Sequence, residues 1–167
     1  MIYDYATVKP TVFRWRYFLL SLVAGLALTV IPLPEQLVYW RPEWISLLVL
    51  YWLLHGSQRF GLVFVFISGL VLDITTGTLL GQHTLGLLLV SAVFIRLQTM
   101  IRVYPQIQQA IIVSSLLVIK LLVVLWVGGM TGREPESTWL FFMPAVSSLF
   151  VWPLLSWILD SSQSSHH

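Results

Sequence analysis

Apolar segments of about 20 residues recur along this chain, and they constrain its fold more than any other feature. The clearest one, 107–127, contains a single charged residue, Lys120. About 20 apolar residues is the length at which an α-helix crosses the hydrocarbon core of a bilayer. Of the 167 residues, 57% are hydrophobic and only 10% are charged, against about 25% charged residues in an average soluble domain. A water-soluble fold of this size could not bury so much apolar surface, so the chain is expected to fold in lipid.

The segments predict an all-α, polytopic membrane protein with a bundle of six transmembrane helices. The second segment is short, and the third reaches full length only if its helix continues through Asp73. The fourth can also start at Gly81, and Pro144 and Pro153 are expected to bend the sixth. Strands of a β-barrel would alternate apolar and polar residues, and these segments do not. The predicted spans are 17–31, 44–54, 60–80, 84–97, 107–127 and 139–159.

The spans divide the chain into an N-terminal segment 1–16, a transmembrane domain 17–159 and a polar tail 160–167, which we expect to be disordered. The first span is expected to be retained rather than cleaved as a signal peptide, because its polar lead-in is long and no convincing cleavage motif follows. Six spans place both termini on one side of the membrane. The positive-inside rule predicts that this side is the cytoplasm, because six basic residues then lie inside and two outside. The inner residues are Lys9, Arg14, Arg16, Arg59, Arg96 and Arg102, and the outer ones are Arg41 and Arg133.

The residue patterns of common catalytic and metal sites do not occur in the sequence. It has no cysteine, which excludes disulfides, thiolate metal sites and cysteine nucleophiles. It has no metalloprotease, P-loop or dinucleotide-binding motif. Asp73 has no second aspartate within the membrane, and His55 and His83 are predicted to lie toward opposite faces. We therefore predict no catalytic, cofactor-binding or metal-binding residues, and the basic residues are too sparse for a nucleic-acid surface.

Two sets of small residues predict surfaces for close helix packing, which stabilises helix pairs in lipid. Ser21, Gly25 and Thr29 recur every fourth residue in the first span and predict a docking face, either for another helix of this chain or for a partner. Gly69, Asp73, Gly77 and Gly81 have the same spacing in the third span. They form a second such face if that helix is continuous. Alternatively, a helix ends near Leu72 and Thr75-Thr76-Gly77 forms a turn.

Three charged residues also stand out. Arg41 begins Arg41-Pro42-Glu43-Trp44, a sequence typical of a helix start at the membrane interface. A second interpretation makes Arg41 a contact for a periplasmic partner. Asp73 and Lys120 each lie 13 residues into parallel spans, and at equal depth an ion pair would offset their desolvation. The alternative is that Lys120 extends to the outer interface and Asp73 lies in a hydrated turn.

Several of these residues belong to motifs that resemble the rod shape-determining protein MreD family. The first motifs are Arg41-Pro42-Glu43-Trp44, Asp73-x-x-x-Gly77-x-Leu79-x-Gly81-x-x-x-Leu85 and Arg102-x-Tyr104-Pro105-x-x-x-Gln109. They are followed by Trp126-x-x-Gly129-x-Thr131-Gly132 and Trp152-Pro153. Their order and spacing carry the resemblance from Arg41 to the end of the sixth span. The tail differs, since it has Asp160 and serines where basic residues are expected.

The resemblance implies a non-enzymatic subunit of the bacterial cytoplasmic (inner) membrane. MreD-like proteins work with the single-span periplasmic protein MreC and the actin-like MreB. Through these they act with RodA and a class B penicillin-binding transpeptidase to organise side-wall peptidoglycan synthesis and rod shape. One alternative remains from another class, a solute-binding subunit resembling the substrate-capturing component of energy-coupling-factor vitamin transporters. It would require a pocket with several convergent polar groups.

Overall fold

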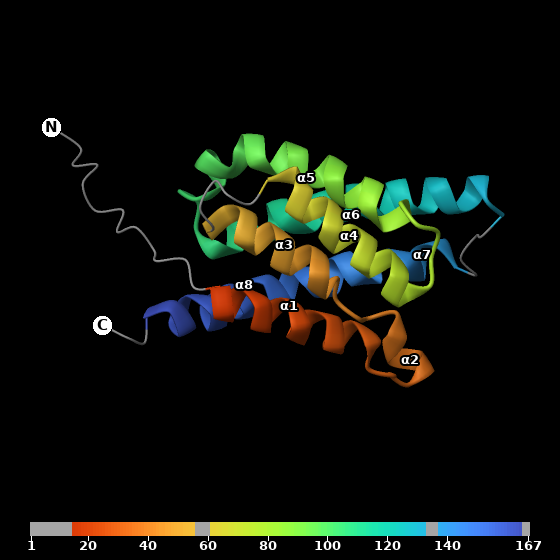
Figure 1. The fold of residues 1–167 in the computed structure, drawn as a ribbon, viewed down its shortest axis with the longest axis horizontal. Helices are drawn as coiled ribbons and strands as arrows, with labels where there is room; N and C mark the ends of the chain where they lie inside the picture. Colours follow the sequence, from red (N-terminus) through yellow and green to blue (C-terminus); the bar gives the residue numbers. More distant parts are fainter. Residues whose placement is uncertain (1–14, 56–60, 133–136, 165–167) are drawn as a thin grey trace, which may run out of the picture.

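The structure is a computed structural model that describes residues 15–55, 61–132 and 137–164. Within these ranges every regular element is a helix (Figure 1), which confirms the all-α fold class. Most of the predicted segment 1–16 and the last three residues lie outside the described ranges. The helices are α1 (Trp15–Val30), α2 (Glu35–Val38), α3 (Trp44–His55), α4 (Leu62–Thr76), α5 (Gln82–Ile101), α6 (Gln106–Met130), α7 (Thr138–Phe141) and α8 (Met143–Ser164).

The six longer helices match the six predicted apolar segments, but they differ in length. Among the described residues, α5, α6 and the segment 138–161 are long and apolar enough to cross a membrane. The apolar helices α1, α3 and α4 are shorter, with 16, 12 and 15 residues. At a rise of about 1.5 Å per residue they are about 18–24 Å long, which is less than the hydrocarbon thickness of about 30 Å. Membrane crossing by all six helices therefore stays a prediction.

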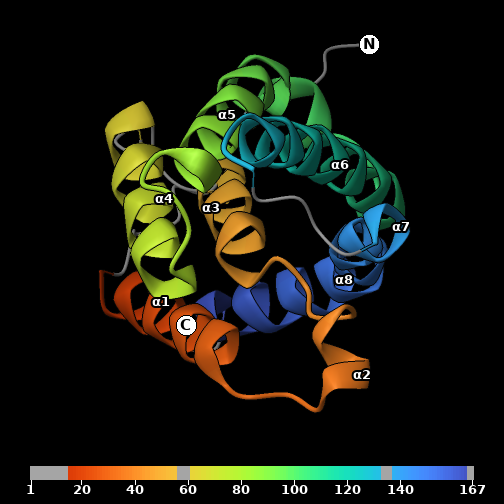
Figure 2. The same cartoon turned by 90° about the vertical axis from the view of Figure 1, so that its right-hand side faces the viewer.

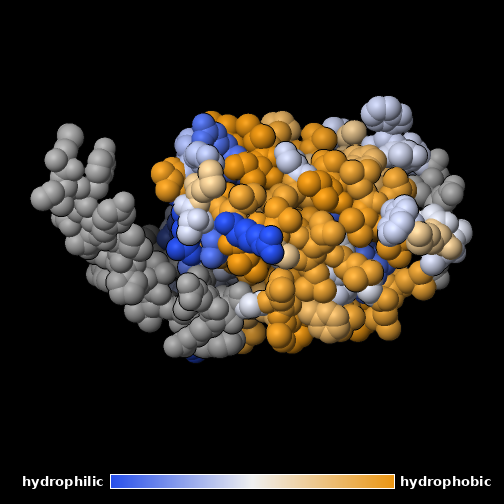
Figure 3. Space-filling view, turned by 90° about the horizontal axis from the view of Figure 1, so that it is seen from above, coloured by the Kyte–Doolittle hydropathy of each residue, from blue (hydrophilic) through white to orange (hydrophobic). Residues whose placement is uncertain are grey.

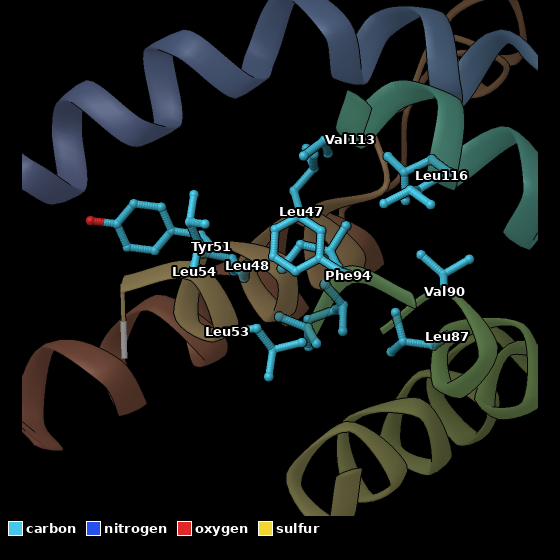
Figure 4. Close-up of a cluster of buried hydrophobic side chains, with 14 of the residues drawn as sticks. Leu47, Leu48, Tyr51, Leu53, Leu54, Leu87, Val90, Phe94, Val113 and Leu116 are labelled. Carbon is cyan, nitrogen blue, oxygen red and sulfur yellow. The ribbon is translucent and has the colours of Figure 1, made fainter. Parts of the chain in front are cut away.

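Helix α3 occupies the centre of the bundle and packs against α1, α4, α5, α6 and α8 (Figure 2). All ten residues from Ile45 to Leu54 are buried. A helix that is apolar on every side is stable where other helices surround it completely. Leu47, Tyr51 and Leu54 of α3 belong to the same buried cluster as Phe94 of α5 and Val113 of α6 (Figure 4).

Helix α4 ends at Thr76, which corrects the prediction of a continuous helix over 60–80. Gly77 adopts a left-handed conformation, with φ 66°, and Gly81 has φ 102° before α5 begins. Residues with a Cβ rarely adopt such angles, so the two glycines form a turn. The alternative correctly placed a turn before the next helix, but α4 ends at Thr76 and not near Leu72, so Thr75 and Thr76 are helical and the turn begins at Gly77. Gly77 and Gly81 therefore do not share a helix face with Gly69.

The C-terminal span differs from the prediction at both ends. The short helix α7 precedes α8, and Pro144 lies in the first turn of α8, where its missing N–H is not needed. Pro153 lies inside the helix. Helix α8 continues to Ser164, past the predicted boundary at residue 159, so the expectation of a disordered tail is wrong for residues 160–164. The C-terminal part of α8 is connected to α3 by a hydrogen bond from Tyr51 Oη to Asp160 Oδ1, at 2.7 Å.

The outer surface of the bundle is largely apolar. Each of the longer helices except α3 exposes large hydrophobic side chains, such as Leu20 on α1 and Phe150 on α8. Figure 3 shows hydrophobic residues over the middle of the bundle and more polar residues toward its two ends. This arrangement suits a protein whose sides face lipid and whose ends face water.

The path of the chain allows the predicted orientation to be tested. Helix α1 begins and α8 ends at the same end of the bundle, while α2, α7 and the α4–α5 turn lie at the other end, here named the α2 end (Figure 1). Because the sequence has no cysteine, single-cysteine variants can be labelled without background. We expect an impermeant thiol reagent added to intact spheroplasts to label Gln36→Cys, which is predicted to be periplasmic, and not Val103→Cys. After lysis of the spheroplasts the reagent should label both variants. Labelling of Val103→Cys but not of Gln36→Cys in intact spheroplasts would overturn the predicted orientation.

A buried polar cluster as candidate functional site

A buried ion pair joins three helices near the α2 end of the bundle. Lys120 of α6 is fully buried, and its Nζ donates to Glu43 Oε2 at the start of α3. Lys120 Nζ also donates to Ser46 Oγ at 3.0 Å, and Ser46 Oγ donates to Glu43 Oε2 at 2.9 Å. The backbone N–H of Glu43 donates to Ser148 Oγ of α8 at 3.2 Å. The pair therefore connects α3, α6 and α8 through one closed network.

The predicted pairing of Lys120 with Asp73 is wrong, because Lys120 bonds Glu43 instead. Equal depth along two parallel helices says nothing about which side of the bundle each helix occupies. Helix α5 packs against both α4 and α6 and lies between them (Figure 2). The alternative is wrong as well, since Lys120 does not reach the interface and Asp73 is fully buried.

Asp73 accepts hydrogen bonds that fix the turn between α4 and α5. Its Oδ2 accepts from the backbone N–H of Gly81 at 2.8 Å and from Thr84 Oγ1 at 2.6 Å. Its Oδ1 accepts from the backbone N–H of His83 at 2.8 Å. The first N–H groups of a helix have no partner within the helix, and a carboxylate also suits the positive end of the helix dipole. Asp73 therefore caps α5 although it lies in the preceding helix.

Gly69 lies one helical turn before Asp73, at a close approach of α4 to α5. A Cβ added at Gly69 would lie 2.7 Å from Thr84 Cα, which is closer than real Cβ contacts allow. The glycine therefore lets the two backbones approach closely. Gly69 marks a packing face as predicted, and the helix that packs on it is α5 of the same chain.

Two residues of the predicted stripe, Ser21 and Gly25, contribute to packing inside the bundle, between α1 and α3. Ser21 Oγ accepts from Trp52 Nε1 at 2.9 Å, and a Cβ at Gly25 would overlap the side chain of Leu48. Thr29 Oγ1 donates to the backbone carbonyl of Gly25 at 2.8 Å. Of the two predicted alternatives, the structure shows the internal one for Ser21 and Gly25, and a docking role of Thr29 stays a prediction.

Arg41 closes the C-terminal end of α1. Its guanidinium donates to the backbone carbonyls of Thr29 and Ile31, two acceptors that have no partner within the helix. A positive charge there is also favourable for the helix dipole. The structure thus gives Arg41 an internal role, and a periplasmic contact for it stays a prediction.

His83 lies close to both groups, because its backbone N–H donates to Asp73 Oδ1 and its side chain lines two hollows together with Glu43. Two small hollows of about 180 and 170 Å³ open beside it, and both are lined by Val38, Glu43, His83 and Pro144. His83 Nδ1 and Arg41 Nε are buried without a hydrogen-bond partner among the described atoms. The cluster of Arg41, Glu43, Asp73, His83 and Lys120 carries two basic side chains and two acidic ones besides the histidine.

This arrangement is suited to holding helices together. The carboxylates of Glu43 and Asp73 are occupied by donors from their own chain. Within the described ranges, no group of three or more histidine, cysteine, aspartate or glutamate side chains could hold a metal ion. The absence of catalytic and cofactor-binding residues stays a prediction from the sequence.

The sequence pattern does not predict Glu43 and Ser46 as partners of Lys120, because Arg41-Pro42-Glu43-Trp44 indicates only a helix start in an outer loop. Helix α3 has only 12 residues, whereas α6 has 25. The start of α3 therefore meets α6 at Lys120, ten residues or about 15 Å from the last residue of α6. The shortness of the second apolar segment was the available signal that Glu43 lies inside the bundle.

Comparisons with known proteins agree with this architecture. The family model described as rod shape-determining protein MreD matches residues 9–161. A curated protein named rod shape-determining protein MreD, from Haemophilus influenzae, is 30% identical over 76 residues. The aligned segment covers 46% of this chain and 47% of that protein, so the match spans about half of the relative. The search of solved structures finds no match. Because the family model covers nearly the whole chain, the chain belongs to the MreD family of rod shape-determining membrane proteins.

Proposed function

We propose that this protein is a non-enzymatic subunit of the bacterial inner membrane that binds a single-span MreC-like protein and helps organise side-wall peptidoglycan synthesis. The observation that carries the proposal is the family match over residues 9–161, since the family's role is the determination of rod shape. The polar cluster supports it, because its carboxylates bind groups of the same chain and hold helices in place.

The proposed partners follow from the family. The main partner is the MreC-like protein, through its transmembrane segment. The same complex would also contain MreB on the cytoplasmic side, RodA and a class B penicillin-binding transpeptidase. The contact between the two proteins lies within the lipid bilayer, and no nucleic acid is among the proposed partners. The family match gives no support to the transporter alternative.

Deletion of the gene in its rod-shaped host tests the proposed function. We expect the cells to become round or swollen, because peptidoglycan synthesis would no longer be distributed along the side wall. Expression of the wild-type chain from a plasmid should restore the length-to-width ratio measured by microscopy. Deletion cells that keep their rod shape would contradict the proposal.

A further inference from the structure

The two hollows beside His83 lie at the α2 end of the bundle, next to the buried ion pair. Their volumes are about 180 and 170 Å³, and both are lined by Val38, Glu43, His83 and Pro144. A cavity needs only about 10–15 Å³ accessible to the centre of a water molecule in order to hold one. Each hollow therefore has room for several water molecules or for a small solute.

The walls of these two hollows contain polar side chains from several parts of the chain. Besides Glu43 and His83, they include Arg41, Thr76 and Ser137. A third hollow of about 540 Å³, between α1 and α4, has Ser68 as the single polar side chain in its wall. A buried water molecule makes about three hydrogen bonds to polar groups. The two hollows beside His83 meet this requirement, and the hollow between α1 and α4 does not.

Glu43 has one carboxylate oxygen that its own chain leaves available. Its Oε2 accepts from Lys120 Nζ and Ser46 Oγ, whereas Oε1 has no donor among the described residues. The side chain of Glu43 is 13% exposed, while that of Lys120 is fully buried. Because Glu43 lines both hollows, they are the route by which solvent reaches the carboxylate end of the ion pair.

The chemistry of the pair favours water over lipid in the hollows. A charged oxygen that loses its hydrogen bonds to water without gaining others is unfavourable. Ionisable residues at membrane depth therefore pair with each other or face a water-filled cavity. Lys120 satisfies Oε2 of Glu43, and water in the hollows supplies the donors that Oε1 needs. An acyl chain in the same place would leave Oε1 in hydrocarbon.

We propose that both hollows are filled with water and give the aqueous phase at the α2 end access to Glu43 and His83. The ion pair is thus hydrated on its carboxylate side, although Lys120 lies about 15 Å along α6 from the end of that helix. The site takes water or a small uncharged solute that donates hydrogen bonds, because Lys120 already balances the charge of Glu43. This inference goes beyond the proposed function and does not depend on any partner protein.

Cysteine accessibility tests the proposal, with Leu117 as a matched control for Leu121. The two leucines lie one helical turn apart on α6 and are 0% and 2% exposed. Leu121 lines one of the hollows beside His83, and Leu117 lines none of the three hollows. Small charged methanethiosulfonate reagents, one cationic and one anionic, are added to membranes of lysed spheroplasts. Because they react with the thiolate, which forms in water and not in apolar surroundings, we expect Leu121→Cys to react at least tenfold faster than Leu117→Cys.

Two controls make this comparison decisive. Val103→Cys, at a position that is 83% exposed, shows that the reagents are active under the same conditions. Unfolding in sodium dodecyl sulfate should make Leu117→Cys and Leu121→Cys react equally, which shows that both thiols are present. Equal rates for these two variants in the membrane would overturn the proposal. So would a Leu121→Cys that stays unmodified while Val103→Cys reacts.

The wild-type chain provides a second measurement that needs no change in the core. In solid-state NMR of the protein in lipid bilayers, we expect the ring nitrogens of His83 to receive magnetisation from water well before the backbone amide of Leu117. The variant His83→Gln identifies the His83 signal by its loss. Equally slow transfer to both sites would show that water does not reach His83 and would overturn the proposal. This measurement decides if Leu121→Cys does not insert into the membrane.

Discussion

Replacing Glu43 with glutamine is expected to lower the free energy of unfolding by about 3–5 kcal/mol, the usual cost of removing one partner of a buried ion pair. The reason is that Lys120 is fully buried and its ammonium donates to Glu43 and Ser46. Without the carboxylate, the buried ammonium of Lys120 keeps an uncompensated charge. The measurement is denaturant-induced or thermal unfolding of the purified protein in detergent, compared with the wild type under identical conditions.

The matched control removes both charges together. The double variant Glu43→Gln/Lys120→Met is expected to recover most of the lost stability, because replacing a whole buried pair by uncharged groups of similar volume is often close to neutral. A single variant as stable as the wild type would show that the pair does not hold α3 and α6 together. The same conclusion would follow if the double variant were less stable than Glu43→Gln alone.

Asp73→Asn is also expected to destabilise the protein, lowering the free energy of unfolding by about 1–3 kcal/mol for each buried donor that loses its acceptor. The wild-type carboxylate accepts from the backbone N–H groups of Gly81, His83 and Thr84. The amide NH₂ of asparagine would face donors at one of the two oxygen positions, and each buried donor left without an acceptor costs about 1–3 kcal/mol. Loosening of the α4–α5 turn should appear as faster proteolysis or hydrogen exchange at residues 77–84.

Thr84→Val is the control for this prediction. It keeps the shape of the side chain and removes only the hydroxyl that donates to Asp73 at 2.6 Å, so we expect a smaller loss of about 1–2 kcal/mol. An equal loss for the two variants would indicate that the hydroxyl of Thr84, and not the backbone donors, accounts for the stabilising effect of Asp73. Wild-type stability of Asp73→Asn would contradict the capping role.

The class of fold follows from the sequence alone, because the bilayer imposes a simple rule on it. Backbone groups in lipid must be satisfied internally, so apolar segments that do not alternate form helices. This predicted helices close to Trp44–His55 and Gln106–Met130. The family resemblance also follows from the sequence alone. The structure explains one residue of its motifs, because Arg41 donates hydrogen bonds to backbone carbonyls at the end of α1.

Other features depended on how the helices meet, which periodicity and composition do not specify. The spacing of Gly69, Asp73, Gly77 and Gly81 fits both a continuous helix and a helix followed by a turn. The structure has the turn at Gly77, and Asp73 accepts a hydrogen bond from the backbone of α5 there. Lys120 could be placed in depth from the sequence, but its partner depends on which helix is adjacent. Because α3 is short and central, Glu43 lies beside Lys120, while α5 separates Lys120 from Asp73. The sequence thus determined the helices and their environment, and only the tertiary structure decided the ion pair and the turn that Asp73 holds.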